Sequence, residues 1–194
     1  MININGNYEA KKDAPLFGLK AGGYVCKIVN AVEKTSKKGN PMIELFLDVA
    51  EGDYADFYTK KFKADKENNP DAKWRCKAYI VIPDAGADEK NFLVRNFKNF
   101  IYAVESSNKG YALIANGGID VVTLRGKAIG YTFGEEEYEK LDGSIGCTVK
   151  PNKAYAVVDI TEGNFAVPKK KEVERKPEPP ASDPWDDEED ELPF

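Results

Sequence analysis

The chain has 194 residues, of which 28 are Lys or Arg, 33 are Asp or Glu and none is His, so its formal net charge is -5. Without histidine, nucleophilic catalysis by a Ser-His or Cys-His pair is excluded and the most common zinc ligand is missing. No apolar run approaches the roughly 20 residues of a membrane-spanning helix, and the length suits one domain with a substantial core.

The first predicted element is a β-hairpin that follows an N-terminal arm over residues 1–21. Residues 24–33 and 42–49 both alternate with the period of a strand. Between them, Ser36-Lys37-Lys38-Gly39-Asn40-Pro41 consists of turn residues. These patterns predict two antiparallel strands joined by a short basic loop.

Two more strands and a helix are predicted next. Residues 57–63 (FYTKKFK) predict a strand with Tyr58, Lys60 and Phe62 on one face. Residues 74–82 alternate apolar side chains with Arg75, Lys77, Tyr79 and Val81, which predicts another strand with Arg75, Lys77 and Tyr79 on one face, and residues 64–73 read as a polar loop. Asp88 is the predicted N-cap of a helix from residue 89 to about residue 106. Its apolar residues recur at the spacing of a helix packed on a sheet.

The remaining predicted strands follow a Gly-rich link. Residues 127–136 and 144–150 flank Asp142-Gly143, a strong hairpin turn signal. Residues 153–160 are predicted to complete the sheet. From Pro168 the composition changes to Lys, Glu and Pro, which indicates a stiffened, disordered connector.

This order of elements predicts a mainly β domain over residues 22–168. Strands, one helix and further strands occur in the order of an oligonucleotide-binding (OB) fold, a five-stranded Greek-key barrel with one helix between strands. Exposed strands and two loops of that fold grip nucleic acid. A different small barrel or a sandwich would produce a similar pattern.

The end of the sequence differs sharply in charge from the rest. Residues 178–194 carry eight acidic and no basic side chains, a charge of -8, whereas residues 1–177 carry 28 basic and 25 acidic residues, a charge of +3. Such a run cannot bury enough apolar surface to fold alone, so we expect it to be disordered. We divide the end into a linker over residues 169–184 and an acidic tip over residues 185–194.

The tip, WDDEEDELPF, combines consecutive acids with an apolar end. The apolar end can fill a pocket while a cation holds the adjacent carboxylate. A merely solvated acidic run would explain the charge but not the apolar residues. The predicted partner-binding residues are Asp186, Asp187, Glu188, Glu189, Asp190, Glu191, Leu192, Pro193 and Phe194.

The tip resembles the acidic tip of bacterial and phage single-stranded-DNA-binding proteins, in which several Asp or Glu precede an apolar residue, Pro and Phe. A second resemblance spans roughly residues 22–168 and concerns an uncharacterised phage- and prophage-encoded family, regarded as single-stranded-DNA-binding. The segments that carry it are Gly39-Asn40-Pro41-Met42, residues 100–111 (FIYAVESSNKGY) and residues 134–150 (GEEEYEKLDGSIGCTVK), continuing to Val167-Pro168. Both resemblances imply a protein that coats single-stranded DNA and recruits replication, recombination or repair proteins through its tip.

The three cysteines, Cys26, Cys76 and Cys147, are an odd number without metal-type spacing, and no signal segment opens the sequence. We therefore expect buried, reduced thiols and a cytoplasmic location, which the resemblance implies is that of a bacterial host cell. No cofactor or metal is predicted.

Binding a single strand without reading its sequence requires cations for phosphates and flat side chains on which bases stack. The predicted strands interleave the two kinds of residue, and the loop after the first strand adds two lysines. The alternative is that the rings belong to the core and the lysines to a solvated face. The predicted DNA-binding residues are Lys37, Lys38, Tyr58, Lys60, Phe62, Arg75, Lys77 and Tyr79.

Two alternative functions are weighed against DNA coating. A recombination mediator, a strand-annealing protein or another interaction protein could use the tail to engage host factors without strong DNA binding of its own. A metal-dependent nuclease would have to use Glu135-Glu136-Glu137, but consecutive strand residues alternate sides and do not converge on one ion. Phosphate-loop and dinucleotide motifs are absent from the sequence, so we do not expect an enzyme.

Overall fold

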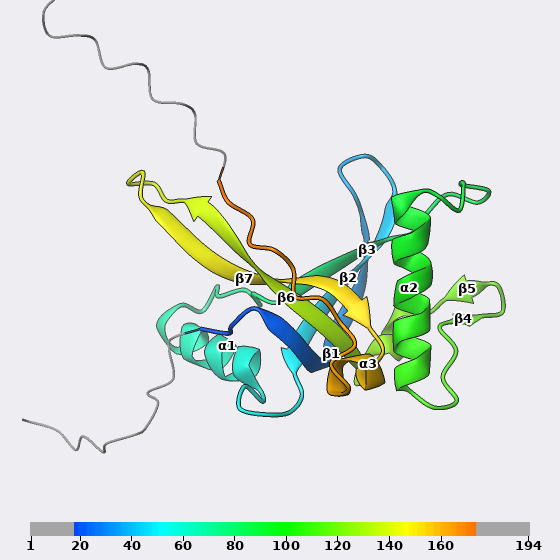
Figure 1. The fold of residues 1–194 in the computed structure, drawn as a ribbon, viewed down its shortest axis with the longest axis horizontal. Coiled ribbons are helices and arrows are strands. Elements are labelled where there is room, and N and C mark those ends of the chain that lie inside the picture. The colour runs from blue at the N-terminus through cyan, green and yellow to red at the C-terminus, as the bar shows by residue number, and fades with distance from the viewer. Residues whose placement is uncertain (1–17, 174–194) are drawn as a thin grey trace, which may run out of the picture.

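A computed structural model describes residues 18–173 as a mainly β architecture (Figure 1). Five antiparallel strands form one sheet in the order β3-β2-β1-β6-β7. These strands are β1 (Gly22–Thr35), β2 (Pro41–Val49), β3 (Lys77–Val81), β6 (Ala128–Glu139) and β7 (Ile145–Tyr155). The helices are α1 (Phe57–Asn68), α2 (Phe92–Ser107), α3 (Val157–Thr161) and the 3-10 helix η1 (Val121–Leu124), and a small hairpin joins β4 (Ile114–Ala115) to β5 (Gly118–Ile119).

The predicted acidic tip and most of the N-terminal arm and linker lie outside the described residues. Within residues 18–173, no helix combines the length and apolar character needed to cross a membrane.

Strand β1 organises the sheet, because it pairs with two neighbours along different parts of its length. It pairs with β2 from Cys26 to Thr35 and with β6 from Gly22 to Lys27. The predicted hairpin of the first two strands is therefore confirmed.

The two edge strands, β3 and β7, are not hydrogen-bonded to each other, although some of their Cα atoms lie within 8 Å. The sheet is not closed into a barrel.

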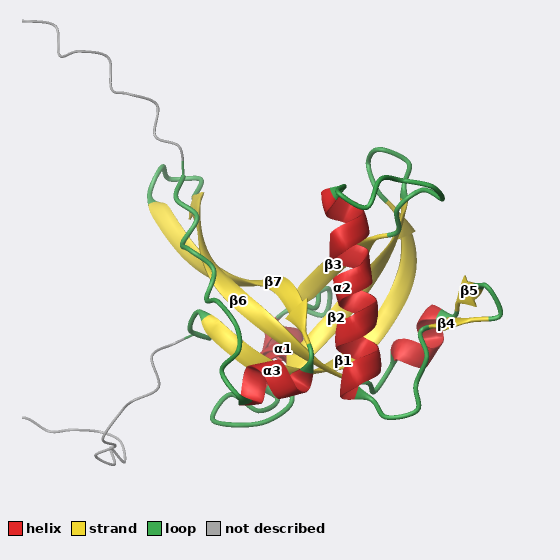
Figure 2. Ribbon diagram, turned by 45° about the vertical axis from the view of Figure 1, so that its right-hand side comes forward, coloured by secondary structure: helices red, strands yellow, loops and turns green. Residues whose placement is uncertain are grey.

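Helix α2 lies against one side of the sheet (Figure 2). It also contributes several residues to the core. Its Phe100, Ala103 and Val104 are fully buried with the strand residues Ile28 and Phe133. The predicted helix is confirmed, but its N-cap is Asn91 rather than Asp88, since the Asn91 side chain accepts a hydrogen bond from the Leu93 amide at 2.9 Å. The Asp88 carboxylate instead accepts from the Lys90 amide, in the turn before the helix.

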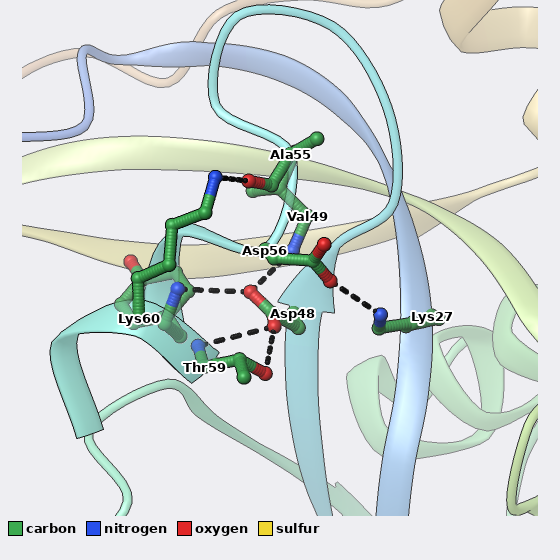
Figure 3. A network of polar contacts seen from close by, with 8 residues as sticks. Lys27, Asp48, Val49, Ala55, Asp56, Thr59 and Lys60 are labelled. Atoms are coloured by element: carbon green, nitrogen blue, oxygen red, sulfur yellow. Dashed lines mark hydrogen bonds and ion pairs between the residues drawn. The ribbon is translucent and has the colours of Figure 1, made fainter. Parts of the chain in front are cut away.

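The strand predicted over residues 57–63 is wrong, because these residues begin α1. The helix continues to Asn68, through part of the predicted polar loop. Asp48, at the end of β2, decides the conformation: its buried carboxylate accepts hydrogen bonds from the amides of Tyr58 at 2.9 Å and Thr59 at 3.1 Å (Figure 3). The first amides of a helix lack partners within it, so a carboxylate from a neighbouring strand stabilises this helix start.

Two further contacts hold the same helix start (Figure 3). The Lys27 ammonium of β1 lies 2.6 Å from a carboxylate oxygen of Asp56, and this hydrogen bond lowers the pKa of Asp56 and raises that of Lys27. The Lys60 ammonium donates to the carbonyl of Ala55 at 2.8 Å. Helix α1 is therefore attached to β1 and β2 at one end.

The last part of the sheet is one hairpin instead of three strands. The turn at Asp142-Gly143 is confirmed, with Gly143 at φ 78°. However, β7 runs without a break to Tyr155, and a register shift opposite Thr132 and Phe133 accommodates its bend. The final strand predicted over residues 153–160 is therefore wrong in its second half.

Residues 157–161 form α3 because a glycine on β6 leaves room for them. A Cβ atom on Gly130 would lie 2.5 Å from the Ile160 side chain and 2.9 Å from the Ala156 carbonyl oxygen. This close approach allows α3 to pack on the sheet instead of extending it.

Beyond α3 the chain returns along β6. The Lys171 amide donates to the Glu135 carbonyl, and the Glu137 amide donates to the Lys171 carbonyl, both at 2.9 Å. Figure 1 shows this segment lying beside the β6–β7 hairpin. We call residues 168–173 the strap; all but the first fall in the predicted linker.

Candidate nucleic-acid interface

A groove of about 510 Å³ opens between β3 and β7, where the sheet does not close, and α1 forms its third wall. Its charged lining residues are Lys61, Arg75, Lys77 and Lys150, and no described Asp or Glu lines it. We call it the β3–β7 groove. A cavity lined by one sign of charge concentrates ligands of the opposite sign, so this groove suits a polyanion.

Strand periodicity places the β3 residues in the groove. Ala78 and Ile80 are buried in the core, while Lys77 and Tyr79 point to the other face. Arg75 precedes the strand by two residues, lines the groove beside Lys77 and is ion-paired with Asp65 of α1 at 2.9 Å. The residues predicted to share one face of residues 74–82 do so.

A buried carboxylate orders two of these side chains. Glu44 of β2 pairs with Tyr79 across the ladder and accepts hydrogen bonds from the Lys77 ammonium at 3.1 Å and the Tyr79 hydroxyl at 3.0 Å. The Lys34 ammonium lies 2.8 Å from its other oxygen, and the Glu44 side chain is only 2% exposed. One negative charge therefore faces two positive ones, and the cluster remains cationic.

The environment of this cluster shifts its pKa values. Burial alone raises the pKa of Glu44, but the hydrogen bonds from Lys34, Lys77 and Tyr79 outweigh it and hold the pKa below its ordinary value. Burial, and then the hydrogen bond to Glu44, raise the pKa of Tyr79, so its hydroxyl stays protonated near neutral pH.

We predict that Glu44 makes folding stability depend on pH. Because its folded pKa is lowered, its contribution is present above the unfolded value of about 4.3 and is lost as the pH falls through the folded pKa. Glu44→Gln should lower the free energy of unfolding by about 1 kcal/mol at pH 7. Urea titrations at pH 7 and at pH 3 should show the difference between wild type and variant shrinking at the lower pH. An equal difference at both values would contradict this assignment.

The aromatic residues near the groove differ in their exposure. Tyr79 is 51% exposed and can present its ring to a ligand. Tyr58 lines the groove but is buried in the core, where desolvation strongly raises the pKa of its hydroxyl. The Lys77 ammonium lies over the ring of Phe46, 4.9 Å from its centroid. Phe57 also lines the groove but is partly buried, so Tyr79 has the most exposed ring among the described residues that line it.

The structure separates the eight predicted binding residues into two groups. Tyr58, Arg75, Lys77 and Tyr79 line the β3–β7 groove. The residues that do not line it are Lys37, Lys38, Lys60 and Phe62.

The four outlying residues have definite positions. Lys37 and Lys38 are exposed in the β1–β2 loop. Lys60 is two residues after Tyr58 on a helix, which turns its side chain by about 200° to another side. Phe62 packs against Trp74 with ring centroids 5.4 Å apart. The proposed common face of Tyr58, Lys60 and Phe62 is therefore wrong, because it assumed strand periodicity.

Sequence reasoning missed two groove cations, Lys61 and Lys150. Lys61 follows Tyr58 by three residues, which places both on the same side of α1. A helical reading of residues 57–68 would have found it. Lys150 comes from β7, more than 70 residues after Lys77, and only the sheet order brings the two together.

The β3–β7 groove continues into a second hollow of about 250 Å³, which we call the strap groove. The two share Lys77, Tyr79, Lys150 and Pro151. The strap groove is also lined by Glu135, Glu136, Asn152 and the strap residues Pro168, Lys169 and Lys171.

The three consecutive glutamates do not form a metal centre. Glu136 pairs with Lys150 at 2.9 Å, and Glu137 pairs with Lys170 at 2.6 Å. Across residues 18–173, no three Cys, Asp or Glu side chains are grouped as metal ligands would be.

The thiols of Cys26 and Cys76 are buried as predicted, whereas Cys147 is exposed, so that part of the prediction is wrong.

No protein-family model matches the chain, and a search of curated proteins finds no significant match. The groove, its charge and its exposed ring therefore provide the basis for inferring a function.

Proposed function

We propose that this protein binds single-stranded DNA in the β3–β7 groove. The observation that carries the proposal is a groove lined by four cations, no described carboxylate and one half-exposed tyrosine ring. Cations spaced along a groove follow phosphates, and stacking on an aromatic ring contributes roughly 1–3 kcal/mol per base. A duplex keeps its bases stacked inside, so Tyr79 favours the single strand.

The sheet topology supports an OB-type fold. The order β3-β2-β1-β6-β7, with α2 between β3 and β6, corresponds to a five-stranded Greek-key barrel opened at its last seam. OB folds are partly open barrels that bind oligonucleotides on the second and third strands and on two flanking loops. Here those strands are β2 and β3, and the corresponding loops contain Lys37, Lys38 and Lys140.

The acidic tip complements this groove in function. We propose that its apolar end recruits replication, recombination or repair proteins. While free, the tip competes with DNA for the groove cations, because both are polyanions. The protein then both protects the strand and brings partners to it.

Fluorescence anisotropy with labelled oligothymidylate tests the proposal, using duplex DNA and single-stranded RNA for comparison. We expect the single strand to bind more tightly than the duplex, with log affinity falling by about 0.7 per phosphate contact for each unit of log salt. Deleting residues 185–194 should tighten DNA binding and abolish capture of host repair helicases or exonucleases.

Two outcomes would overturn the proposal. Equal affinity for duplex and single strand would exclude a stacking site. Absence of DNA binding by the full chain would favour a mediator whose tail engages host factors. If deleting the tip changed neither DNA binding nor partner capture, only the role proposed for the tip would be contradicted.

A further inference from the structure

The strap is held against β6 by contacts of several kinds. Besides the two backbone hydrogen bonds at Lys171, the Lys170 ammonium lies 2.6 Å from a Glu137 carboxylate oxygen. Pro168 packs on Gly134, where an added Cβ atom would lie 2.9 Å from the Pro168 Cβ. The strap therefore has a defined seat that depends on the absence of a side chain at residue 134.

Strand periodicity gives the three strap lysines two different positions. Residues in extended backbone alternate sides, so Lys169 and Lys171 lie opposite Lys170. Lys170 pairs with Glu137, whereas Lys169 and Lys171 both line the strap groove. One lysine anchors the strap and the other two face the hollow that continues the β3–β7 groove.

The charge of the strap groove is positive in spite of its acids. Lys77, Lys150, Lys169 and Lys171 line it together with Glu135 and Glu136. Glu136 is paired with Lys150, whose side chain is 57% exposed. Exposed pairs contribute little to stability, so a phosphate can replace the carboxylate as the partner of such a lysine.

We infer that Lys169 and Lys171 of the strap form, with Lys150, a phosphate-binding subsite that extends the DNA path from the β3–β7 groove along β6. The inference rests on the proposed function and deepens it. It assigns the ligand as the phosphate backbone of a nucleic-acid strand, because this subsite contains three cations and no aromatic ring except Tyr79 at its junction with the β3–β7 groove.

The competing explanation is that the strap only covers the free edge of β6 beyond its pairing with β1. Unpaired edges invite association with other strands, and a covering segment prevents it. That role needs the backbone of the strap and the Lys170 anchor, but not Lys169 or Lys171. The two explanations therefore differ in what replacing these lysines should do.

The first test measures oligothymidylate affinity of Lys169→Ala/Lys171→Ala across a salt series. Loss of two phosphate contacts should reduce the slope of log affinity against log salt by about 1.4. Lys90→Ala/Lys109→Ala is the matched control, because it removes the same charge from residues that line neither groove. An unchanged slope in the strap variant, with the wild type binding normally, would overturn the subsite.

The second test displaces the strap without altering its charge. In Gly134→Ala the new methyl group meets the Pro168 ring, so the strap must move. Hydrogen exchange at the Lys171 and Glu137 amides should accelerate, and DNA affinity should fall. In Gly118→Ala, the control, the added atom meets open space.

A triple variant that combines Gly134→Ala with Lys169→Ala/Lys171→Ala shows whether the two tests report on the same subsite. If Gly134→Ala acts by removing the strap lysines from the path, adding it to Lys169→Ala/Lys171→Ala should cause no further loss of affinity. Independent losses would show that Gly134→Ala perturbs the sheet and not the subsite. Absence of DNA binding by the wild type would overturn the proposed function and the subsite together, a result distinct from an unchanged slope.

Discussion

Replacement of Lys61, Arg75, Lys77 and Lys150 by alanine is expected to weaken oligothymidylate binding by about 100-fold or more near physiological salt. Each cation lines the β3–β7 groove, and neutralising one phosphate contributes about 0.7 to the salt slope, so loss of four contacts should lower that slope by nearly 3. Fluorescence anisotropy over a salt series measures both quantities.

The control for this variant must remove the same charge. Lys66, Lys90, Lys98 and Lys109 line neither groove, and their joint replacement by alanine should leave the salt slope almost unchanged. Urea denaturation of both variants separates a binding defect from unfolding, since Lys77 is also a partner of Glu44. Similar losses in the two variants would mean that net charge, rather than the β3–β7 groove, governs binding.

Asp48→Ala is expected to cause the largest loss of stability, about 3 kcal/mol in the free energy of unfolding. The carboxylate is fully buried and accepts from the amides of Val49, Tyr58 and Thr59 and from the Thr59 hydroxyl. Its removal leaves several buried donors without partners, each of which costs about 1–3 kcal/mol if nothing replaces the bond. Chemical denaturation at pH 7 measures the change.

The same substitution should affect DNA binding through α1. Lys61 reaches the β3–β7 groove only because α1 begins beside Asp48, so loosening this helix removes one wall of the groove. Asp56→Asn is the control, because it removes an exposed ion pair with Lys27 while asparagine tolerates the φ of 58° at this position, so its effect should be much smaller. Equal destabilisation by both variants would contradict the role assigned to Asp48.

Local pattern was sufficient wherever neighbouring residues alone decide the structure. The β1–β2 hairpin follows from strict alternation around a turn, the Asp142-Gly143 hairpin from its turn residues, and α2 from an apolar stripe with helical spacing. The same alternation correctly grouped Arg75, Lys77 and Tyr79, which lie on one strand or directly before it. The mainly β class and the change of charge near residue 178 are likewise properties of the sequence alone.

Tertiary contacts decided the remainder, because the deciding groups lie far along the chain. Residues 57–63 fit a strand as well as a helix, and the Asp48 carboxylate favours the helix by accepting its first free amides. Gly130 determines in the same way that residues 157–161 pack as α3. The groove itself depends on a sheet order that brings β3 and β7 to the same seam, where cations from α1, β3 and β7 meet. The periodicity of a sequence can place side chains only within one helix or strand, whereas this site is formed by three elements.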